Sequence, residues 1–125
     1  MLPYSAFLKP GRVSVFAGDF HSYEAMDEYV DPGGRFEQDF GFRLDERYLP
    51  EVFVEAQPVP IRQLVSGFSA ADSFAEAVCA AAERLSREMA NTMVVFYFCE
   101  FDPARVTINP RAPLVFLGAF QFSGQ

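Results

Sequence analysis

The residues best suited to chemistry lie in one segment, Asp19 to Glu55. This segment holds eleven acidic residues against three arginines, so it carries a formal charge of −8, whereas the whole chain carries −7. Carboxylates at this density can attract a basic protein surface, bind a metal ion or form an acid–base pair. Everything outside the segment sums to +1, so the rest of the chain is interpreted as the scaffold that folds and presents it.

A metal-assisted hydrolase is one interpretation of the start of this segment. Asp19, His21 and Glu24 could gather around a metal ion at a turn between a strand and a helix. His21 is the only histidine, however, and a set with so few strong ligands has low specificity for any metal. The sequence contains no phosphate-binding loop, dinucleotide fingerprint, serine-hydrolase elbow or zinc-protease motif. We therefore expect no enzyme, no catalytic residue, no metal and no cofactor, and keep the hydrolase as an alternative.

Binding of a protein partner suits the segment better. Aromatic residues are interleaved with the acidic ones, so the charges would steer a basic partner and a ring or two would anchor it. The alternative is that the rings are core and that the charges only keep the protein soluble. The predicted partner-binding residues are Asp19, Phe20, Glu24, Asp27, Glu28, Asp31, Glu37, Asp39, Asp45, Glu46 and Glu51.

Length and composition set the class of protein. A chain of 125 residues makes one domain, 1–125, in which residues 1–11 are expected to form an N-terminal arm. A hydrophobic content of 50% with fifteen phenylalanines excludes a disordered chain. A pI near 4.6 argues against nucleic acid and anionic membranes as partners. With no basic leader and no apolar run near the ~20 residues of a membrane span, we expect a soluble cytoplasmic protein whose Cys79 and Cys99 are buried, reduced thiols.

The secondary structure that must position the acidic segment is clear at both ends of the chain. Apolar and alternating runs predict strands over residues 12–18, 93–99, 105–108 and 114–120, with a bulge at Gly118. Helical spacing predicts helices over 23–30, capped by Ser22, and over 69–89, beginning with a capping box at Ser69. Residues 36–55 follow neither period, and 57–60 are expected to be an extended connector.

This order of elements predicts an α+β fold: a single domain with a mainly antiparallel sheet of about four strands and two helices packed largely on one face. Strands 93–99 and 114–120 are apolar on both sides and therefore need a second cover. The phenylalanines of the acidic segment could supply that cover, and so could a homodimer interface.

Several stretches, in this order, resemble the immunity protein 22 family of bacterial polymorphic toxin systems. They are an opening strand and Gly-x-Phe turn (residues 13–20), an acidic helix ending in Glu28-Tyr29, a central motif (36–41, then Asp45-Glu46), Ala90-Asn91 before an aromatic strand, and a final strand (116–120). Together they cover most of residues 13–120. The chain departs from the family in its short 31–34 connection and in Phe16, where Trp is often found.

The resemblance implies a cytoplasmic protein that binds and neutralises a cognate toxin, often a nuclease, encoded beside it. It carries over no catalytic residues. We hypothesise that the acidic surface binds a basic nuclease groove, where carboxylates mimic phosphates. The competing interpretation is an acidic protein-binding adaptor of unrelated role.

Overall fold

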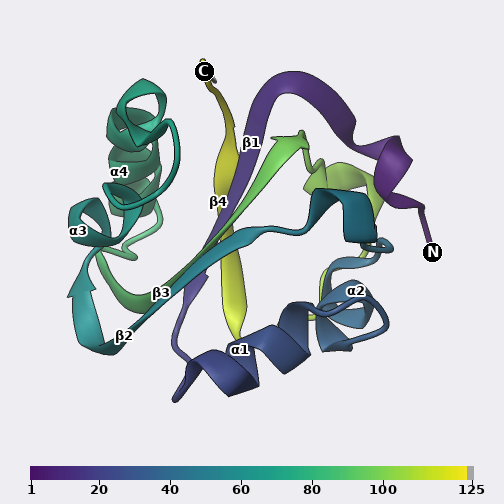
Figure 1. Cartoon of the computed structure of the whole chain (residues 1–125), viewed down its shortest axis with the longest axis horizontal. Coiled ribbons are helices and arrows are strands. Elements are labelled where there is room, and N and C mark those ends of the chain that lie inside the picture. The colour runs from purple at the N-terminus through teal and green to yellow at the C-terminus, as the bar shows by residue number, and fades with distance from the viewer. Residues whose placement is uncertain (124–125) are drawn as a thin grey trace.

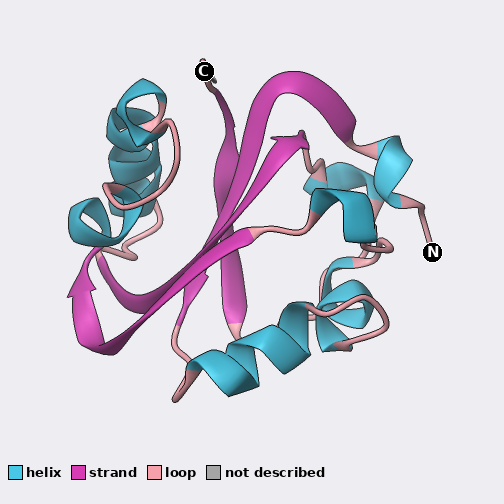
Figure 2. Cartoon of the chain, viewed as in Figure 1, coloured by secondary structure: helices cyan, strands magenta, loops and turns pink. Residues whose placement is uncertain are grey.

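The computed structural model describes residues 1–123 and contains one four-stranded sheet (Figures 1 and 2). The strands are antiparallel and lie in the order β2-β3-β1-β4. Their bounds are β1 Leu8–Gly18, β2 Glu51–Pro60, β3 Met89–Cys99 and β4 Leu114–Gln121. The prediction of a strand over 105–108 is wrong, because the turn η4 (Pro103–Arg105) and irregular backbone occupy that stretch. The fourth strand is β2, which includes the expected 57–60 connector.

Helices cover both faces of this sheet (Figure 1). Helices α1 (Tyr23–Val30) and α2 (Arg35–Phe40) lie on one face, and α3 (Ile61–Val65) and α4 (Ala75–Arg84) on the other. The predicted single α+β domain, with an antiparallel sheet of four strands and two main helices packed against it, is confirmed. The main helices α1 and α4 nevertheless lie on opposite faces instead of sharing one, because central strands that are apolar on both sides need a cover on each side.

The alternation along β1 divides the interior into two cores. Val13, Val15 and Ala17 face α3 and α4 in a mainly aliphatic core, whereas Phe16 faces α1 and α2 in an aromatic core. In the aromatic core the Phe16 ring lies 4.9 Å from the Phe40 ring, measured between centroids. The second cover for the sheet thus comes from within the chain.

The phenylalanines at positions 36, 40 and 42 follow no single period because two of them lie in a helix and the third lies in extended backbone. Phe36 and Phe40 lie four residues apart on α2, with their ring centroids 4.7 Å apart. Gly41 then ends the helix in the left-handed conformation with φ of 79°. Phe42 follows in extended backbone that bridges to Leu2, so its spacing of two from Phe40 is not helical.

Three further expectations are revised by the structure. Residues 8–11 belong to β1, so the arm is limited to residues 1–7, which include the turn η1 (Tyr4–Ala6). The long helix predicted over 69–89 is only α4, preceded by the turn η3 (Ala71–Ser73), and Ser69 does not cap it. Cys99 is buried and Cys79 half-buried, and both are free thiols.

Two expectations about local structure are confirmed. The β1–β4 register shifts between Val15 and Phe16, opposite Gly118, whose φ of 148° marks the predicted bulge. The Ser22 hydroxyl accepts a hydrogen bond from the Ala25 backbone N–H and caps α1. Among residues 1–123, no helix has the length and apolar character needed to span a bilayer.

Candidate functional site

Four carboxylates form a ridge along the exposed side of α1. Their spacing of three, one and three residues places them on one side of the helix, while Met26, Tyr29 and Val30 are buried on the other. Within residues 1–123 none of the four carboxylates takes part in an ion pair or a side-chain hydrogen bond. We call this set the α1 ridge: Glu24, Asp27, Glu28 and the helix C-cap Asp31.

The loop that leads into α1 is held mainly by one residue, Asn91 of β3. Its Oδ1 accepts a hydrogen bond from the Phe20 N–H at 2.8 Å, and its Nδ2 donates to the Phe20 and Glu55 carbonyls at 2.5 and 3.1 Å. The Asn91 backbone N–H also donates to Asp19 Oδ1 at 3.0 Å. Asn91 thereby fixes the start of α1 against the sheet. The sequence prediction did not include it among the site residues, although Ala90-Asn91 is one of the stretches that carry the resemblance.

An open hollow of about 490 Å³ lies beside the ridge. It is lined by Asp19, Phe20, His21, Ala25, Glu28, Tyr29, Arg35, Arg111 and Pro113. Its two arginines come from the start of α2 and from the loop before β4, and the Arg35 guanidinium lies 6.0 Å from the centre of the Tyr29 ring. With acidic and basic groups on its walls, the hollow can accept a charged side chain of either sign. No local pattern predicts that Arg111, from far along the chain, lies at this site.

Asp39 does not belong to the surface. It is 5% exposed, and its carboxylate accepts hydrogen bonds from the Tyr29 hydroxyl at 2.6 Å and the Asn109 amide at 2.8 Å. Burial raises the pKa of Tyr29, and the hydrogen bond to Asp39 raises it further. Asp39 therefore links α1, α2 and the loop before β4, and its prediction as a partner-binding residue is corrected.

Two further predicted carboxylates have partners within their own region of the fold. Glu37 Oε2 accepts the Leu44 backbone N–H at 2.8 Å, which fixes the chain after α2. Asp45 caps the turn η2 (Glu46–Tyr48) and pairs with the Arg47 guanidinium at 2.8 Å. The hydrogen bonds from Arg47 lower the pKa of Asp45 to about 2. These carboxylates stabilise local structure, whereas Glu46 is exposed and has no side-chain partner among the described residues.

Glu51 also serves the fold. Its carboxylate accepts hydrogen bonds from the Tyr97 hydroxyl at 2.6 Å and from the Ser69 N–H and hydroxyl at 3.0 and 2.9 Å. Burial raises the pKa of Glu51, but these hydrogen bonds outweigh it and leave that pKa below its usual value. Glu51 thus connects β2 to β3 and to the loop before α4.

The interleaved rings are mostly core. Phe36 and Phe40 are buried, and Tyr48 stacks on Tyr4 with centroids 5.4 Å apart. Phe53 packs on Phe68 in the aliphatic core. Phe20 and Tyr29 line the hollow, where Phe20 is half-buried against the buried Tyr29 ring. The exposed surface of the segment is therefore carried mainly by carboxylates.

The ligand set of the alternative metal site does not assemble. In the part of the chain that the structure describes, no group of three or more His, Cys, Asp and Glu side chains is placed to hold a metal ion. Asp19 instead lies near the Arg87 guanidinium, 3.9 Å away, and receives the Asn91 N–H.

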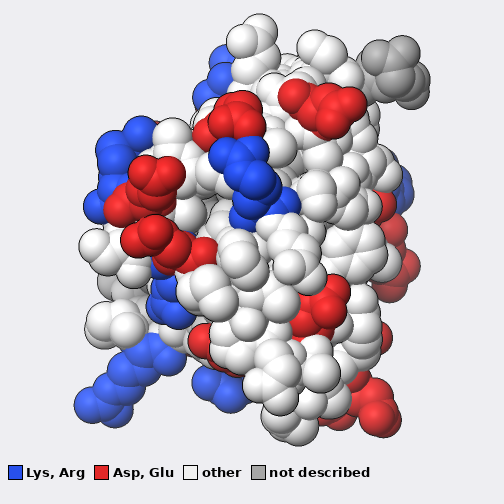
Figure 3. Space-filling view, turned by 90° about the vertical axis from the view of Figure 1, so that its left-hand side faces the viewer, with Lys and Arg blue, Asp and Glu red and all other residues white. Residues whose placement is uncertain are grey.

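The face formed by α3 and α4 differs from the ridge in its charge. Figure 3 shows acidic and basic side chains interspersed over it. Arg62 of α3 and Glu76 of α4 form an ion pair there, with Nη2 and Oε1 3.3 Å apart. The concentration of unpaired negative charge is thus a property of α1 and not of helical surfaces in this protein generally.

Comparison of the chain with protein-family models, with curated proteins and with solved structures finds no match.

Proposed function

We propose that the chain is a bacterial immunity protein, which binds a cognate toxin domain in the cytoplasm and neutralises it through the α1 ridge. The toxin domain is basic, as a nuclease with a phosphate-binding groove would be. The observation that carries the proposal is a stripe of four exposed carboxylates that has no neutralising partner among the described residues.

The first support for the proposal is that the ridge is unfavourable for the isolated helix. Like charges three or four residues apart on a helix destabilise it by a few tenths of a kcal/mol per pair. Asp31 at the C-cap also places negative charge at the negative end of the helix macrodipole. Solubility does not require such an arrangement, since the α3–α4 face is charged with both signs. A basic partner would relieve the repulsion when it binds.

The second support comes from how the helix is held. The Ser22 cap and the two hydrogen bonds between the Asn91 side chain and the Phe20 backbone fix the start of α1. The buried Tyr29–Asp39 contact fixes its end against α2. The ridge is therefore presented in one orientation. Rigid presentation reduces the conformational entropy that is lost on binding.

The hollow beside the ridge suggests how the partner is oriented. Asp19 and Glu28 are placed to accept a lysine or arginine side chain, whereas Arg35 and Arg111 are placed to accept a carboxylate. A partner with its basic groove over the ridge and an acidic residue at the groove's rim would satisfy both sets. The wrong orientation would bring like charges together, which costs affinity.

The resemblance to the immunity protein 22 family gives the third support. Several of its stretches lie in contact in this fold: Asp19-Phe20 is bound by Asn91, and the 36–41 stretch lies in α2 and its C-cap Gly41, with Phe36 and Phe40 packed on Phe16. The stretches thus form the frame that carries α1.

Co-expression tests the proposal. The proposal predicts that the reading frame immediately upstream ends in a toxin domain. That domain is co-expressed with the chain, and growth of the cells is the readout. The ridge variant carries Glu24→Gln, Asp27→Asn, Glu28→Gln and Asp31→Asn. A control with the same change in net charge alters exposed carboxylates outside the ridge and carries Asp72→Asn, Glu76→Gln, Glu83→Gln and Glu88→Gln.

We expect the wild type and the control to restore growth and the ridge variant to fail. Failure of the wild type to protect would refute the immunity function and leave an acidic adaptor as the better interpretation. Protection by the ridge variant at the level of the wild type would refute the role of the ridge alone.

A further inference from the structure

A second surface, unrelated to the ridge, is an apolar groove of about 410 Å³. It is lined by Leu8, Pro10, Tyr48 and Phe98. The Phe98 side chain is 46% exposed and that of Leu8 is 41% exposed. Single exposed apolar residues need no explanation, but several that share one groove mark a contact surface. We call it the Phe98 groove.

The end of β3 and the start of β1, which carry groove residues, lie at the opposite end of the sheet from helix α1 (Figure 1). Phe98 is at the end of β3 and Leu8 at the start of β1, where Leu8 pairs with Cys99. The ridge follows the other end of β1, beyond Gly18. The two surfaces can therefore be occupied at the same time.

The backbone at Phe98 is strained. Its φ of 57° lies in the left-handed region, which a bulky residue rarely adopts. The β1–β3 register shifts at this point, between the Leu8–Cys99 and Val13–Tyr97 pairs. This bulge interrupts the alternation of β3 and turns the ring of Phe98 outward, against the edge of Phe122.

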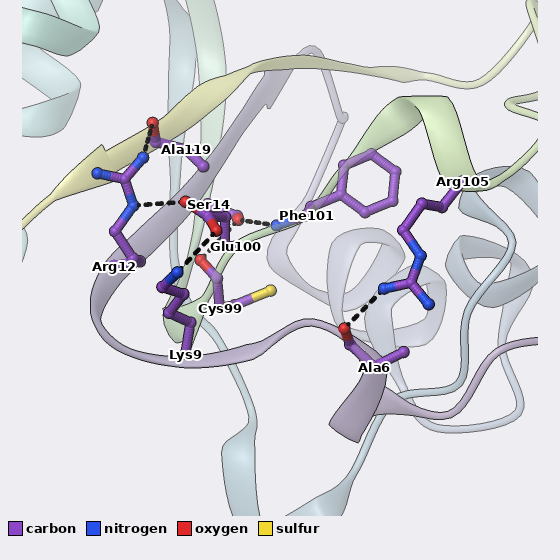
Figure 4. Close-up of polar contacts among 9 residues, drawn as sticks. All are labelled: Ala6, Lys9, Arg12, Ser14, Cys99, Glu100, Phe101, Arg105 and Ala119. Carbon is purple, nitrogen blue, oxygen red and sulfur yellow. Dashed lines mark hydrogen bonds and ion pairs between the residues drawn. The ribbon is translucent and has the colours of Figure 1, made fainter.

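Hydrogen bonds on the C-terminal side of Phe98 hold this conformation (Figure 4). The buried Ser14 hydroxyl donates to the Cys99 carbonyl and accepts the Phe101 N–H, both at 2.9 Å. The Glu100 N–H donates to the Phe7 carbonyl at 2.7 Å. Strain of this kind persists only where the surroundings enforce it, and it gathers at sites of function. The outward ring is thus built into the fold.

Charge around the groove is nearly balanced. The Glu100 carboxylate lies 3.6 Å from Lys9 Nζ and 2.9 Å from Arg12 Nε (Figure 4). The Arg12 Nε–H is not aligned with the carboxylate, so this contact is an ion pair without a hydrogen bond. Within two positions of the groove residues in the sequence there are three basic and two acidic residues: Lys9, Arg12, Arg47, Glu46 and Glu100.

We propose that the Phe98 groove joins two copies of this chain in a two-fold symmetric dimer, in which each Phe98 ring enters the groove of the other copy. A two-fold contact requires a self-complementary patch, and here a protruding ring and a hollow lie side by side. The distribution of charge also favours the Phe98 groove as the contact surface. Two chains of net charge −7 repel each other, and the ridge most strongly, whereas the groove end is close to neutral.

The dimer needs more area than the groove alone offers. A stable interface buries about 800 Å² on each partner. Leu49, which is 53% exposed and follows Tyr48 in the chain, is an exposed apolar residue that the proposed interface would include. The arrangement leaves both ridges free at the outer ends, and it does not depend on the proposed immunity function.

Sedimentation velocity and light scattering on the full chain test the dimer. We expect the wild type to reach twice the chain mass of 14.0 kDa as concentration rises, and then to increase no further. Phe98→Gly should weaken the dimer at least ~30-fold, the loss typical of a central interface residue. Glycine accepts the left-handed backbone, so this variant keeps the bulge. Leu8→Asp places a negative charge on the β1 side of the groove and should also give monomers.

The matched control is Leu85→Asp, because Leu85 is 50% exposed but lies at the end of α4 outside the groove. It should leave the dimer intact. Circular dichroism shows whether each variant is folded. If Phe98→Gly is unfolded, the mass of Leu8→Asp tests the dimer instead.

Three results would overturn the dimer. A wild type that keeps the mass of one chain up to a concentration of about 1 mM would show that the dimer does not form. Masses that grow past two chains would contradict a two-fold contact, since they indicate head-to-tail assembly. Folded groove variants that dimerise as tightly as the wild type would place the contact elsewhere.

Discussion

Removing two carboxylates from the middle of the α1 ridge should stabilise the folded protein. The perturbation is Asp27→Asn combined with Glu28→Gln. Four like-charge pairs lie three or four residues apart in the ridge, Glu24 with Asp27 and with Glu28, and Asp31 with the same two residues. Every pair includes Asp27 or Glu28, so the double variant removes all four. Both positions are exposed, and each replacement preserves the shape of the side chain.

The expected magnitude follows from the number of pairs. Each like-charge pair on a helix surface destabilises by about 0.2–0.5 kcal/mol, so four pairs give a gain of ~1–2 kcal/mol in the free energy of unfolding. Helix propensity changes little, because Gln is close to Glu and Asn is close to Asp. For a domain of this length, 1 kcal/mol corresponds to a rise of roughly 4 °C in Tm.

Thermal and urea unfolding at low and high salt provide the assay. The gain should be largest at ~0.01 M salt and should nearly vanish at ~1 M, where the Debye length falls to about 3 Å. The matched control is Glu83→Gln on α4, where charges of both signs are present, and it should change Tm little. A double variant that is less stable than the wild type would refute the reasoning. So would a gain in stability that is the same at low and high salt, because repulsion between exposed charges is screened by salt.

Two further predictions follow from the buried polar contacts. Asn91→Ala should lower the free energy of unfolding by about 2–3 kcal/mol in urea denaturation, because it leaves the Phe20 N–H and the Phe20 and Glu55 carbonyls without their hydrogen-bond partner. A loss no larger than that of the exposed control Gln57→Ala would contradict the role given to Asn91. Glu51 has a pKa lowered in the folded state, so its stabilisation is present at neutral pH and is lost as the pH falls below about 4.5. Glu51→Gln should therefore be less stable than the wild type at pH 7 and approach it at lower pH in parallel thermal melts, and a difference that grows on acidification would contradict that sign.

The elements with a continuous local pattern were predictable from sequence. The first helix follows from the Ser22 cap and the spacing of its apolar residues, and the bulge follows from a glycine within an apolar strand. The edge strand β2 was not recognised, because it carries Pro58 and Pro60 and its apolar residues do not alternate along the strand. An edge strand hydrogen-bonds on one side only and so tolerates proline. The pattern of residues 36–42 was obscure because the helix ends at Gly41, between two buried rings.

The acidic segment indicates where the candidate site lies, but only some of its carboxylates are exposed and unpaired. Its charge identified α1, whose four carboxylates are exposed and unpaired within residues 1–123. Composition could not separate these from Asp39 and Glu51, because the hydrogen-bond partners of those two residues, Asn109 and Tyr97, come from far along the chain. It could not separate them from Glu37 either, whose partner is the nearby Leu44 backbone N–H. Long-range partners of this kind are set by the tertiary fold and leave no local signal. Arg111 was missed for the same reason.

The most direct test of the central claim is the salt dependence of toxin binding. The measurement is surface plasmon resonance of the purified chain on the toxin domain that the proposal predicts to be encoded upstream, in ~0.01–1 M salt, for the wild type and the ridge variant. We expect the association rate constant of the wild type to fall steeply with salt while the dissociation rate constant changes little, and the ridge variant to show a much shallower dependence. An affinity indifferent to ionic strength, or equal slopes for the two proteins, would contradict an electrostatic role for the α1 ridge.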